Sequence, residues 1–73
     1  MAQEIVEFPL PGKITSVDVK VGGEVKEGDV LCILESMKME NPILAPVGGI
    51  ITKLELSVGQ VVSAGDLVAS IEY

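Results

Sequence analysis

The sequence predicts an all-β protein, a flattened sandwich of eight short strands built from two pseudo-two-fold related halves of four strands each. Three observations support this class. Nearly half of the 73 residues are apolar (48%), mostly Val, Ile and Leu, and the β-branched bias favours strands over helices. Gly and Pro turn signals recur about every 8–12 residues, as in sandwiches and barrels. Finally, residues 46–72 repeat residues 9–35 without a gap.

The repeat has a constant offset of 37 residues, and it includes turn residues as well as apolar positions. Neither half can bury an apolar face alone, so we expect the halves to pack together around a pseudo-two-fold axis. The offset relates Lys38 to the two ends of the chain, which predicts that the termini lie at the opposite end of the molecule from Lys38. The clearest matched pairs are Pro9/Pro46, Gly12/Gly49, Gly28-Asp29/Gly65-Asp66 and Glu35/Glu72.

Each predicted strand lies between turn signals, and no stretch shows a helical period or a capped helix start. In chain order the predicted strands cover residues 4–8, 13–19, 24–26, 30–35, 39–44, 50–56, 61–63 and 67–72.

The first four strands are separated by glycine and proline. The first ends before Pro9–Gly12, and the third lies between Gly22-Gly23 and Gly28-Asp29. The second is identified by alternation of apolar and polar residues. The fourth contains the run Val30–Leu34, which is apolar throughout, so we expect it to be buried on both faces. Cys32 lies within that run and is predicted to pack in the core.

The last four strands follow the same pattern. The fifth begins at Met39 and ends before the turn Pro46–Gly49, and the sixth alternates clearly from Ile51 onward. The seventh and eighth lie on either side of Gly65-Asp66. Because Gly28-Asp29 occupies the matched position in the first half, and no further carboxylates cluster there, these pairs are predicted to form turns rather than cation sites.

Composition excludes several functions. The net charge of −6 disfavours nucleic acid as a partner, and no apolar run reaches the length needed for direct membrane insertion. Residues 1–10 contain Glu4 and Glu7 and no basic region, unlike a signal peptide. A single cysteine, Cys32, fits a reducing compartment, so a cytoplasmic location is expected. The absence of histidine removes the commonest general base and the commonest metal ligand.

The strongest functional signal is Lys38, which lies near the midpoint of the chain between Met37 and Met39. Residues 36–39 are predicted to form a tight hairpin that projects the lysine into solvent. Met37-Lys38 lacks the usual Asn-Gly chemistry, so the sequence does not define the turn type. Most turn lysines are simply solvated, but exposed methionines on both sides of a turn are unusual. This segment is therefore predicted to be recognised by another protein.

The segment Glu35–Asn41 resembles the biotin attachment motif of the biotinyl/lipoyl domain family, with Ser36 where alanine is commoner. The resemblance extends from Pro9 to Glu72, nearly the whole chain, and implies one biotinyl domain over residues 1–73 with a barrel-sandwich hybrid fold. It implies that biotin protein ligase joins biotin to Lys38, recognising the flanking methionines. Glu35 and Glu40 then flank the lysine and keep the hairpin acidic, or are themselves recognised by the ligase.

The resemblance also implies a role. Biotin carboxylase carboxylates the biotin, and the arm delivers the carboxyl group to a carboxyltransferase, while the carrier makes no bonds itself. The gapless repeat leaves no room for the thumb loop of some acetyl-CoA carboxylase carriers. The chain therefore resembles the thumbless domains of propionyl-CoA and pyruvate carboxylases or of sodium-pumping decarboxylases. Either it works in trans, or it is a fragment of a larger chain with an introduced Met1.

Two alternatives remain open. One is a lipoyl carrier domain of an acyl-transfer complex, although related lipoyl domains usually carry Asp-Lys-Ala at this turn. The other is an unmodified interaction module, similar to the lipoyl-like hairpins of export adaptors. Such a module has no need of a solvent-exposed lysine between two methionines, and both alternatives are less favoured than biotin.

Overall fold

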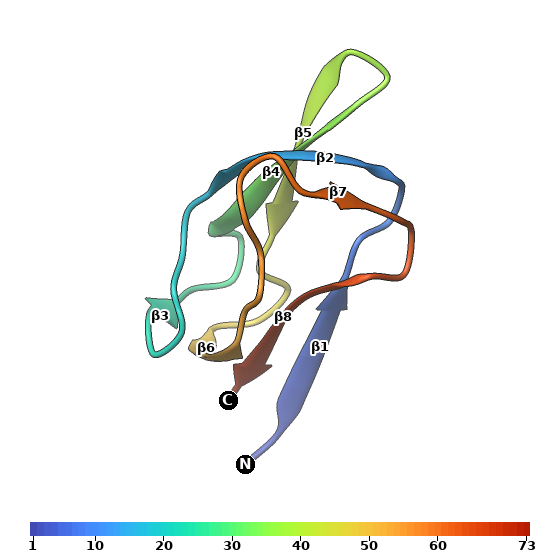
Figure 1. Cartoon of the computed structure of the whole chain (residues 1–73). Coiled ribbons are helices and arrows are strands. Elements are labelled where there is room, and N and C mark those ends of the chain that lie inside the picture. Colours follow the sequence, from blue (N-terminus) through green and yellow to red (C-terminus); the bar gives the residue numbers. More distant parts are fainter.

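Eight strands form two four-stranded antiparallel sheets in the computed structural model, which describes all 73 residues (Figure 1). We call β1-β8-β6-β3 the terminal sheet, because it contains the first and last strands, and β5-β4-β2-β7 the hairpin sheet. The predicted all-β sandwich is confirmed. The strands are β1 (Gln3–Glu7), β2 (Gly12–Val17), β3 (Glu24–Val25), β4 (Val30–Ser36), β5 (Met39–Leu44), β6 (Gly49–Lys53), β7 (Val61–Val62) and β8 (Leu67–Glu72).

The predicted pseudo-two-fold symmetry extends to individual hydrogen bonds. The amide N–H of Gly22 donates to the carbonyl of Ile51 at 2.8 Å, and its counterpart, the N–H of Gly59, donates to the carbonyl of Ile14 at 2.7 Å. These bonds join one half of the chain to the other, since β3 pairs with β6 and β7 pairs with β2. Each sheet therefore contains strands from both halves, so the two layers of the sandwich are not the two halves of the sequence.

Bulges at equivalent places explain why the alternation in β2 and β6 is imperfect. The register shifts between Ile14 and Ser16 in β2 and between Ile51 and Lys53 in β6. At each bulge a threonine hydroxyl donates to a carbonyl of the neighbouring strand, Thr15 to Ile33 and Thr52 to Ser70, both at 3.3 Å. Each bulge changes which side chains face the core. Both strands end earlier than predicted, at residues 17 and 53.

Fourteen buried hydrophobic residues form one core between the sheets. Phe8 has the largest buried side chain, and Cys32 is buried as predicted. The prediction that Val30–Leu34 is buried on both faces is wrong, because Val30 is 37% exposed and Ile33 is half-buried. The outer face of β4 lies at the surface of the sandwich. The core comprises Val6, Phe8, Ile14, Val25, Leu31, Cys32, Leu34, Ile43, Ala45, Ile51, Val62, Val68, Ala69 and Ile71.

The Gly-Asp pairs form matched turns, as predicted. Gly28 and Gly65 both have φ of 90°, a left-handed conformation that glycine adopts readily. The Asp29 carboxylate accepts a hydrogen bond from the amide of Lys26, and the Asp66 carboxylate accepts one from the amide of Ser63, each at 2.8 Å. These bonds close the turns locally.

The molecule is elongated, with extents of 37 × 19 × 18 Å. The β4–β5 hairpin projects from one end and both termini lie at the other, which confirms the placement predicted from the offset (Figure 1). Ala2 and Tyr73 exchange backbone hydrogen bonds of 2.7 and 2.9 Å, so the chain ends are held side by side. No helix of membrane-spanning length and hydrophobicity occurs in the structure.

Burial of the Cys32 thiol makes the stability of the protein depend on pH in the alkaline range. Desolvation in the core, together with the charge of Asp18, raises the pKa of the Cys32 thiol from 9.0 to about 11. Above pH 9 the unfolded chain loses this proton while the folded chain keeps it, so stability falls between pH 9 and about 11. We expect about 1 kcal/mol of this loss by pH 10.

The measurement is urea unfolding of the wild type and of Cys32→Ala at pH 8 and pH 10. The lysines are common to both proteins, so the difference between their pH responses isolates the thiol. Equal losses of stability in the two proteins would contradict the assignment.

Candidate functional site

The β4–β5 hairpin places Lys38 at the far end of the molecule. Ser36 pairs with Met39 across the hairpin, so Met37 and Lys38 form the two-residue turn that the sequence predicts. Both turn residues have positive φ, 56° for Met37 and 65° for Lys38. Positive φ at both central residues is the pattern of a type I′ turn, whose twist matches the twist of the flanking strands.

This turn is strained because neither residue is glycine or asparagine. The left-handed conformation costs an L-residue with a Cβ roughly 1–2 kcal/mol. The rest of the hairpin holds the turn in place, since β4 and β5 pair along their whole length and Leu34 and Ile43 are buried. Strained backbone of this kind occurs mainly where the side chains serve a function. The hairpin thus presents Met37 and Lys38 at a conformational cost.

Met37→Gly should therefore stabilise the protein. Glycine adopts φ near 56° without a Cβ clash, and Met37 is 91% exposed, so its removal leaves no cavity. We expect the free energy of unfolding to rise by about 1 kcal/mol in urea denaturation. Ser36→Gly is the matched control, since Ser36 lies within β4 and glycine weakens a strand interior. Destabilisation by Met37→Gly would show that the methionine packs against the fold.

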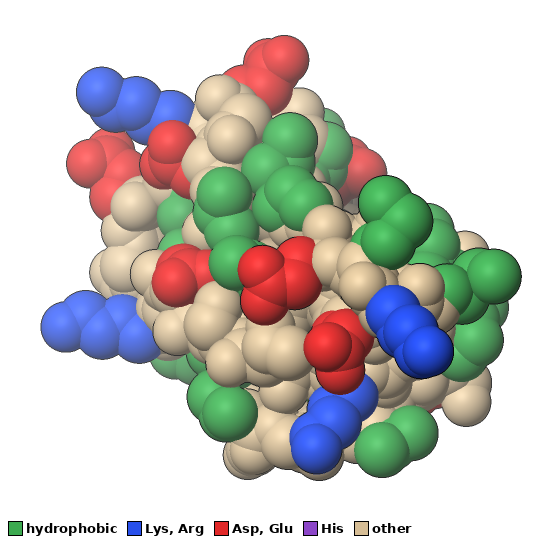
Figure 2. Space-filling view, turned by 90° about the horizontal axis from the view of Figure 1, so that it is seen from above, with side chains coloured by type: hydrophobic (Ala, Val, Ile, Leu, Met, Phe, Trp, Pro, Cys, Tyr) green, Lys and Arg blue, Asp and Glu red, His purple; other side chains and the backbone are tan.

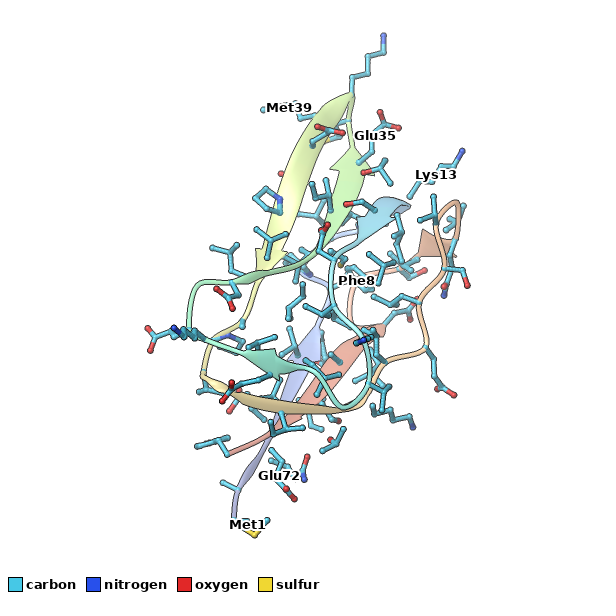
Figure 3. All side chains as sticks on the ribbon, turned by 90° about the vertical axis from the view of Figure 1, so that its left-hand side faces the viewer. Met1, Phe8, Lys13, Glu35, Met39 and Glu72 are labelled. Atoms are coloured by element: carbon cyan, nitrogen blue, oxygen red, sulfur yellow. The ribbon has the colours of Figure 1, made fainter.

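All six predicted site residues lie on this one hairpin. Lys38, Glu35 and Glu40 are exposed, Ser36 is half-buried, and Met39 is 67% exposed. Met39 and Glu35 lie at the opposite end of the molecule from Met1 and Glu72 (Figure 3). The structure contains no pocket. An exposed primary amine on a projecting turn fits a group that is attached covalently.

Glu35 and Glu40 face each other directly across β4 and β5. Like charges in this position destabilise a strand pair. On its other side Glu35 pairs with Lys13 of β2. At the other end of the molecule the equivalent pair is Glu72 and Gln3, where the Gln3 amide donates to the Glu72 carboxylate at 3.3 Å. The hairpin therefore keeps two adjacent carboxylates where its symmetry mate has a hydrogen-bonded pair.

Asn41 is a site residue that the sequence interpretation quoted within the motif but gave no role. Its side-chain amide donates to the carbonyl of Met39 at 3.2 Å and to the carbonyl of Leu34 at 3.4 Å. The bond to Leu34 links β5 to β4, and the bond to Met39 lies within β5 beside the turn. The signal in the sequence for this role is an asparagine within a predicted strand, opposite the apolar Leu34 across the predicted hairpin.

A lysine held at the tip of a projecting hairpin is the arrangement that the resemblance to a carrier domain predicts. The family model described as "Biotin-requiring enzyme" matches residues 4–71. The chain belongs to this family, and it is a biotin carboxyl carrier domain of the kind found in biotin-dependent carboxylases and decarboxylases.

Similar proteins include gamma subunits of two decarboxylases. The chain is 58% identical over 43 residues to methylmalonyl-CoA decarboxylase subunit gamma of Veillonella parvula, covering 59% of this chain and 33% of the relative. It is 62% identical over 39 residues to glutaconyl-CoA decarboxylase subunit gamma of Acidaminococcus fermentans, covering 53% of this chain and 27% of the relative. The chain thus spans a third or less of the length of these relatives.

Solved structures support the same fold. Urea carboxylase of Kluyveromyces lactis superposes with a TM-score of 0.89 at 33% identity, over 99% of this chain and 6% of that one. A single-chain, multi-domain long-chain acyl-CoA carboxylase superposes with a TM-score of 0.85 at 28% identity, over 93% of this chain and 7% of that one. In both proteins the matching region is a small part of a much larger chain.

Proposed function

We propose that Lys38 carries covalently attached biotin. Biotin protein ligase activates biotin as its adenylate, and the Lys38 amine attacks the activated carbonyl. An amide forms, AMP leaves, and the amine releases a proton. The observation that carries this proposal is the strained turn, which exposes Lys38 between two exposed methionines at the end of the molecule farthest from the termini.

The biotinylated chain then acts as a mobile carrier, with residues 1–73 forming one biotinyl domain. Biotin carboxylase loads the carboxyl group and a carboxyltransferase unloads it, in a carboxylase of the acyl-CoA or pyruvate type or in a related decarboxylase. Tethering raises the effective concentration of the carried group at each active site. The chain supplies attachment, reach and recognition, and the chemistry takes place on its partners. The proposed compartment is the cytoplasm, where the buried Cys32 thiol stays reduced.

Biotin fits this hairpin better than lipoate does. Lipoyl domains usually carry Asp-Lys-Ala at the equivalent turn, whereas here both neighbours of Lys38 are methionines whose side chains are free to be recognised. An unmodified interaction module has no use for a lysine in a strained turn. Streptavidin blotting and the intact mass of the native protein distinguish the three possibilities. One added biotinyl group supports the proposal, and a lipoyl group or an unmodified mass overturns it.

The double variant Met37→Asp with Met39→Ala, which imitates the lipoyl pattern, should lower the rate of biotinylation or of later carboxyl transfer. Because both methionines are exposed, we expect the melting temperature to change little. Thermal unfolding and a timed ligase assay measure the two effects separately. A loss of several kcal/mol in stability, the size expected for truncated core methionine, would show instead that the methionines support the core.

A further inference from the structure

All three methionines of the chain are exposed to solvent. Met1 is 101% exposed, Met37 is 91% exposed and Met39 is 67% exposed. Methionine commonly fills gaps in a protein core, but the 14 buried residues of this core include none. Every thioether of the chain therefore belongs to a side chain that reagents in solution can reach.

Two of these methionines are the immediate neighbours of Lys38, and the third lies far away. Met37 forms the turn together with Lys38, and Met39 begins β5. Seen from the hairpin end, hydrophobic side chains lie open at the surface with acidic side chains among them (Figure 2). Met1 lies at the opposite end of the molecule from Met39 (Figure 3). It is therefore an internal reference for chemistry on an exposed methionine away from the lysine.

The one other sulfur of the chain is protected from oxidation. Cys32 is a free cysteine whose side chain is fully buried. Burial, together with the charge of Asp18, raises the pKa of its thiol to about 11, so the reactive thiolate is scarce at neutral pH. The chain also contains no tryptophan and no histidine. Mild oxidation is thus directed to the methionines.

We propose that Met37 and Met39 form a reversible oxidation site that controls whether biotin is loaded onto Lys38. The oxidant is a peroxide such as hydrogen peroxide. This inference rests on the proposed function, in which biotin protein ligase recognises the two methionines. Oxidation at Met1 leaves loading unchanged, because Met1 is at the other end of the molecule.

The chemical step is the conversion of methionine to its sulfoxide. The sulfur lone pair attacks one oxygen of hydrogen peroxide, a sulfur–oxygen bond forms, the oxygen–oxygen bond breaks and water leaves. The sulfur loses two electrons and the peroxide gains them. A dithiol reverses the step in the presence of methionine sulfoxide reductase: the two thiols become a disulfide, and the sulfoxide oxygen leaves as water.

Oxidation changes the surface that the ligase contacts without disturbing the fold. Methionine has no hydrogen-bond donor and only a weak acceptor, so an enzyme that recognises it contacts its apolar surface. The sulfoxide oxygen is polar, and burying it in such a contact without a partner is unfavourable. Because Met37 and Met39 are exposed, the added oxygens do not enter the core. Lys38 therefore stays on its turn and loses recognition.

The test uses the chain before biotin is attached, because the thioether of biotin is itself open to oxidation. The chain is treated with hydrogen peroxide, the peroxide is removed with catalase, and biotin protein ligase, ATP and biotin are then added. Peptide mapping locates the added oxygens, which we expect on the methionines and not on Cys32. Circular dichroism should be unchanged.

The rate of biotinylation is measured over a range of chain concentrations. For the chain oxidised at both Met37 and Met39, we expect the KM of the ligase for the chain to rise at least about tenfold, the effect of one buried polar mismatch. Treatment with the reductases for both sulfoxide epimers and dithiothreitol should restore the KM of the untreated chain.

The matched control is Met37→Leu with Met39→Leu, which keeps apolar side chains but removes the oxidisable sulfurs from the hairpin. Met1 remains and is oxidised as before. Each protein is compared with its own untreated sample, and peroxide should leave the KM of this variant unchanged. A competition within one partly oxidised wild-type sample needs no variant. When the ligase is limiting, biotin should appear first on peptides in which Met37 and Met39 are both unoxidised.

The outcomes separate this inference from the proposed function. If the untreated chain takes no biotin, the proposed function fails. If the chain with both sulfoxides shows the untreated KM, the oxidation site is wrong and the carrier assignment stands. An equal rise in KM for the leucine variant also overturns the inference, because the cause then lies outside the hairpin. A rise that the reductases do not reverse overturns it as well, since the site is then damaged rather than switched.

Discussion

Lys38→Arg is expected to abolish biotin incorporation completely while leaving the fold intact. The guanidinium keeps the positive charge of the exposed turn, but it does not act as a nucleophile toward biotinyl-adenylate at neutral pH. Lys13, Lys20, Lys26 and Lys53 lie outside the β4–β5 hairpin and none sits between two methionines, so none should substitute for Lys38. Streptavidin blotting after co-expression with ligase and biotin measures the loss.

The control for this variant is Lys53→Arg, which makes the same change in β6 of the terminal sheet. It should be biotinylated as fully as the wild type. Circular dichroism and thermal unfolding of both variants should match the wild type. Full labelling of Lys38→Arg would show that the hairpin lysine is not the acceptor.

Phe8→Ala should have the largest effect on stability. Phe8 is buried in the core. The equivalent residue in the second half is the much smaller Ala45, and both are 2% exposed. Truncation of a buried phenylalanine costs about 3–5 kcal/mol, because the core relaxes only partly around the cavity. A domain of this length has a total stability of only about 4–11 kcal/mol. Urea unfolding should therefore show a loss of roughly a quarter or more of the total stability.

Tyr73→Ala is the control, since Tyr73 is the other aromatic residue and is exposed. Its backbone bonds to Ala2 do not involve the side chain, so the change should stay within about 0.5 kcal/mol. A small effect of Phe8→Ala would mean that the surrounding core side chains collapse into the space. In that case the core is less tightly specified than its burial indicates.

The strand pattern could be predicted because the same pattern occurs in both halves of the repeat. Each strand in one half has a partner at an offset of 37 in the other, so weak signals such as those for β3 and β7 reinforce each other. The strand limits at Val17 and Lys53 could not be predicted, because the apolar residues continue as far as Val19 and Leu56. These residues still pack against the core after the chain has left the sheet.

The exchange of strands between the two halves could not be predicted from the sequence. The two-residue strands β3 and β7 carry no signal for their partners, and only the structure shows that each pairs with a strand of the other half. The prediction that the apolar run Val30–Leu34 is buried on both faces was wrong for a related reason. A continuous apolar run indicates burial on both faces only in a sheet covered on both sides, and here β4 has one face at the surface.

The candidate site was the most predictable part, because the hairpin motif is local in sequence. Its position and exposure follow from Met37-Lys38 and the strands on either side. The type I′ geometry does not, since neither residue has the usual preference for it. The two-residue turn fixes the register that places Glu35 opposite Glu40, but the hydrogen bonds of the Asn41 amide and of Gln3 to Glu72 are visible only in the structure.

The central claim is that this turn makes Lys38 the one residue that carries biotin. The most direct measurement is peptide mapping by mass spectrometry of the whole chain after co-expression with biotin protein ligase and biotin. The account predicts one biotinyl group, located on the peptide that contains Met37, Lys38 and Met39, with the other four lysines unmodified. Biotin on any other lysine, or an unmodified Lys38 under conditions that label another biotin carrier domain fully, would contradict it.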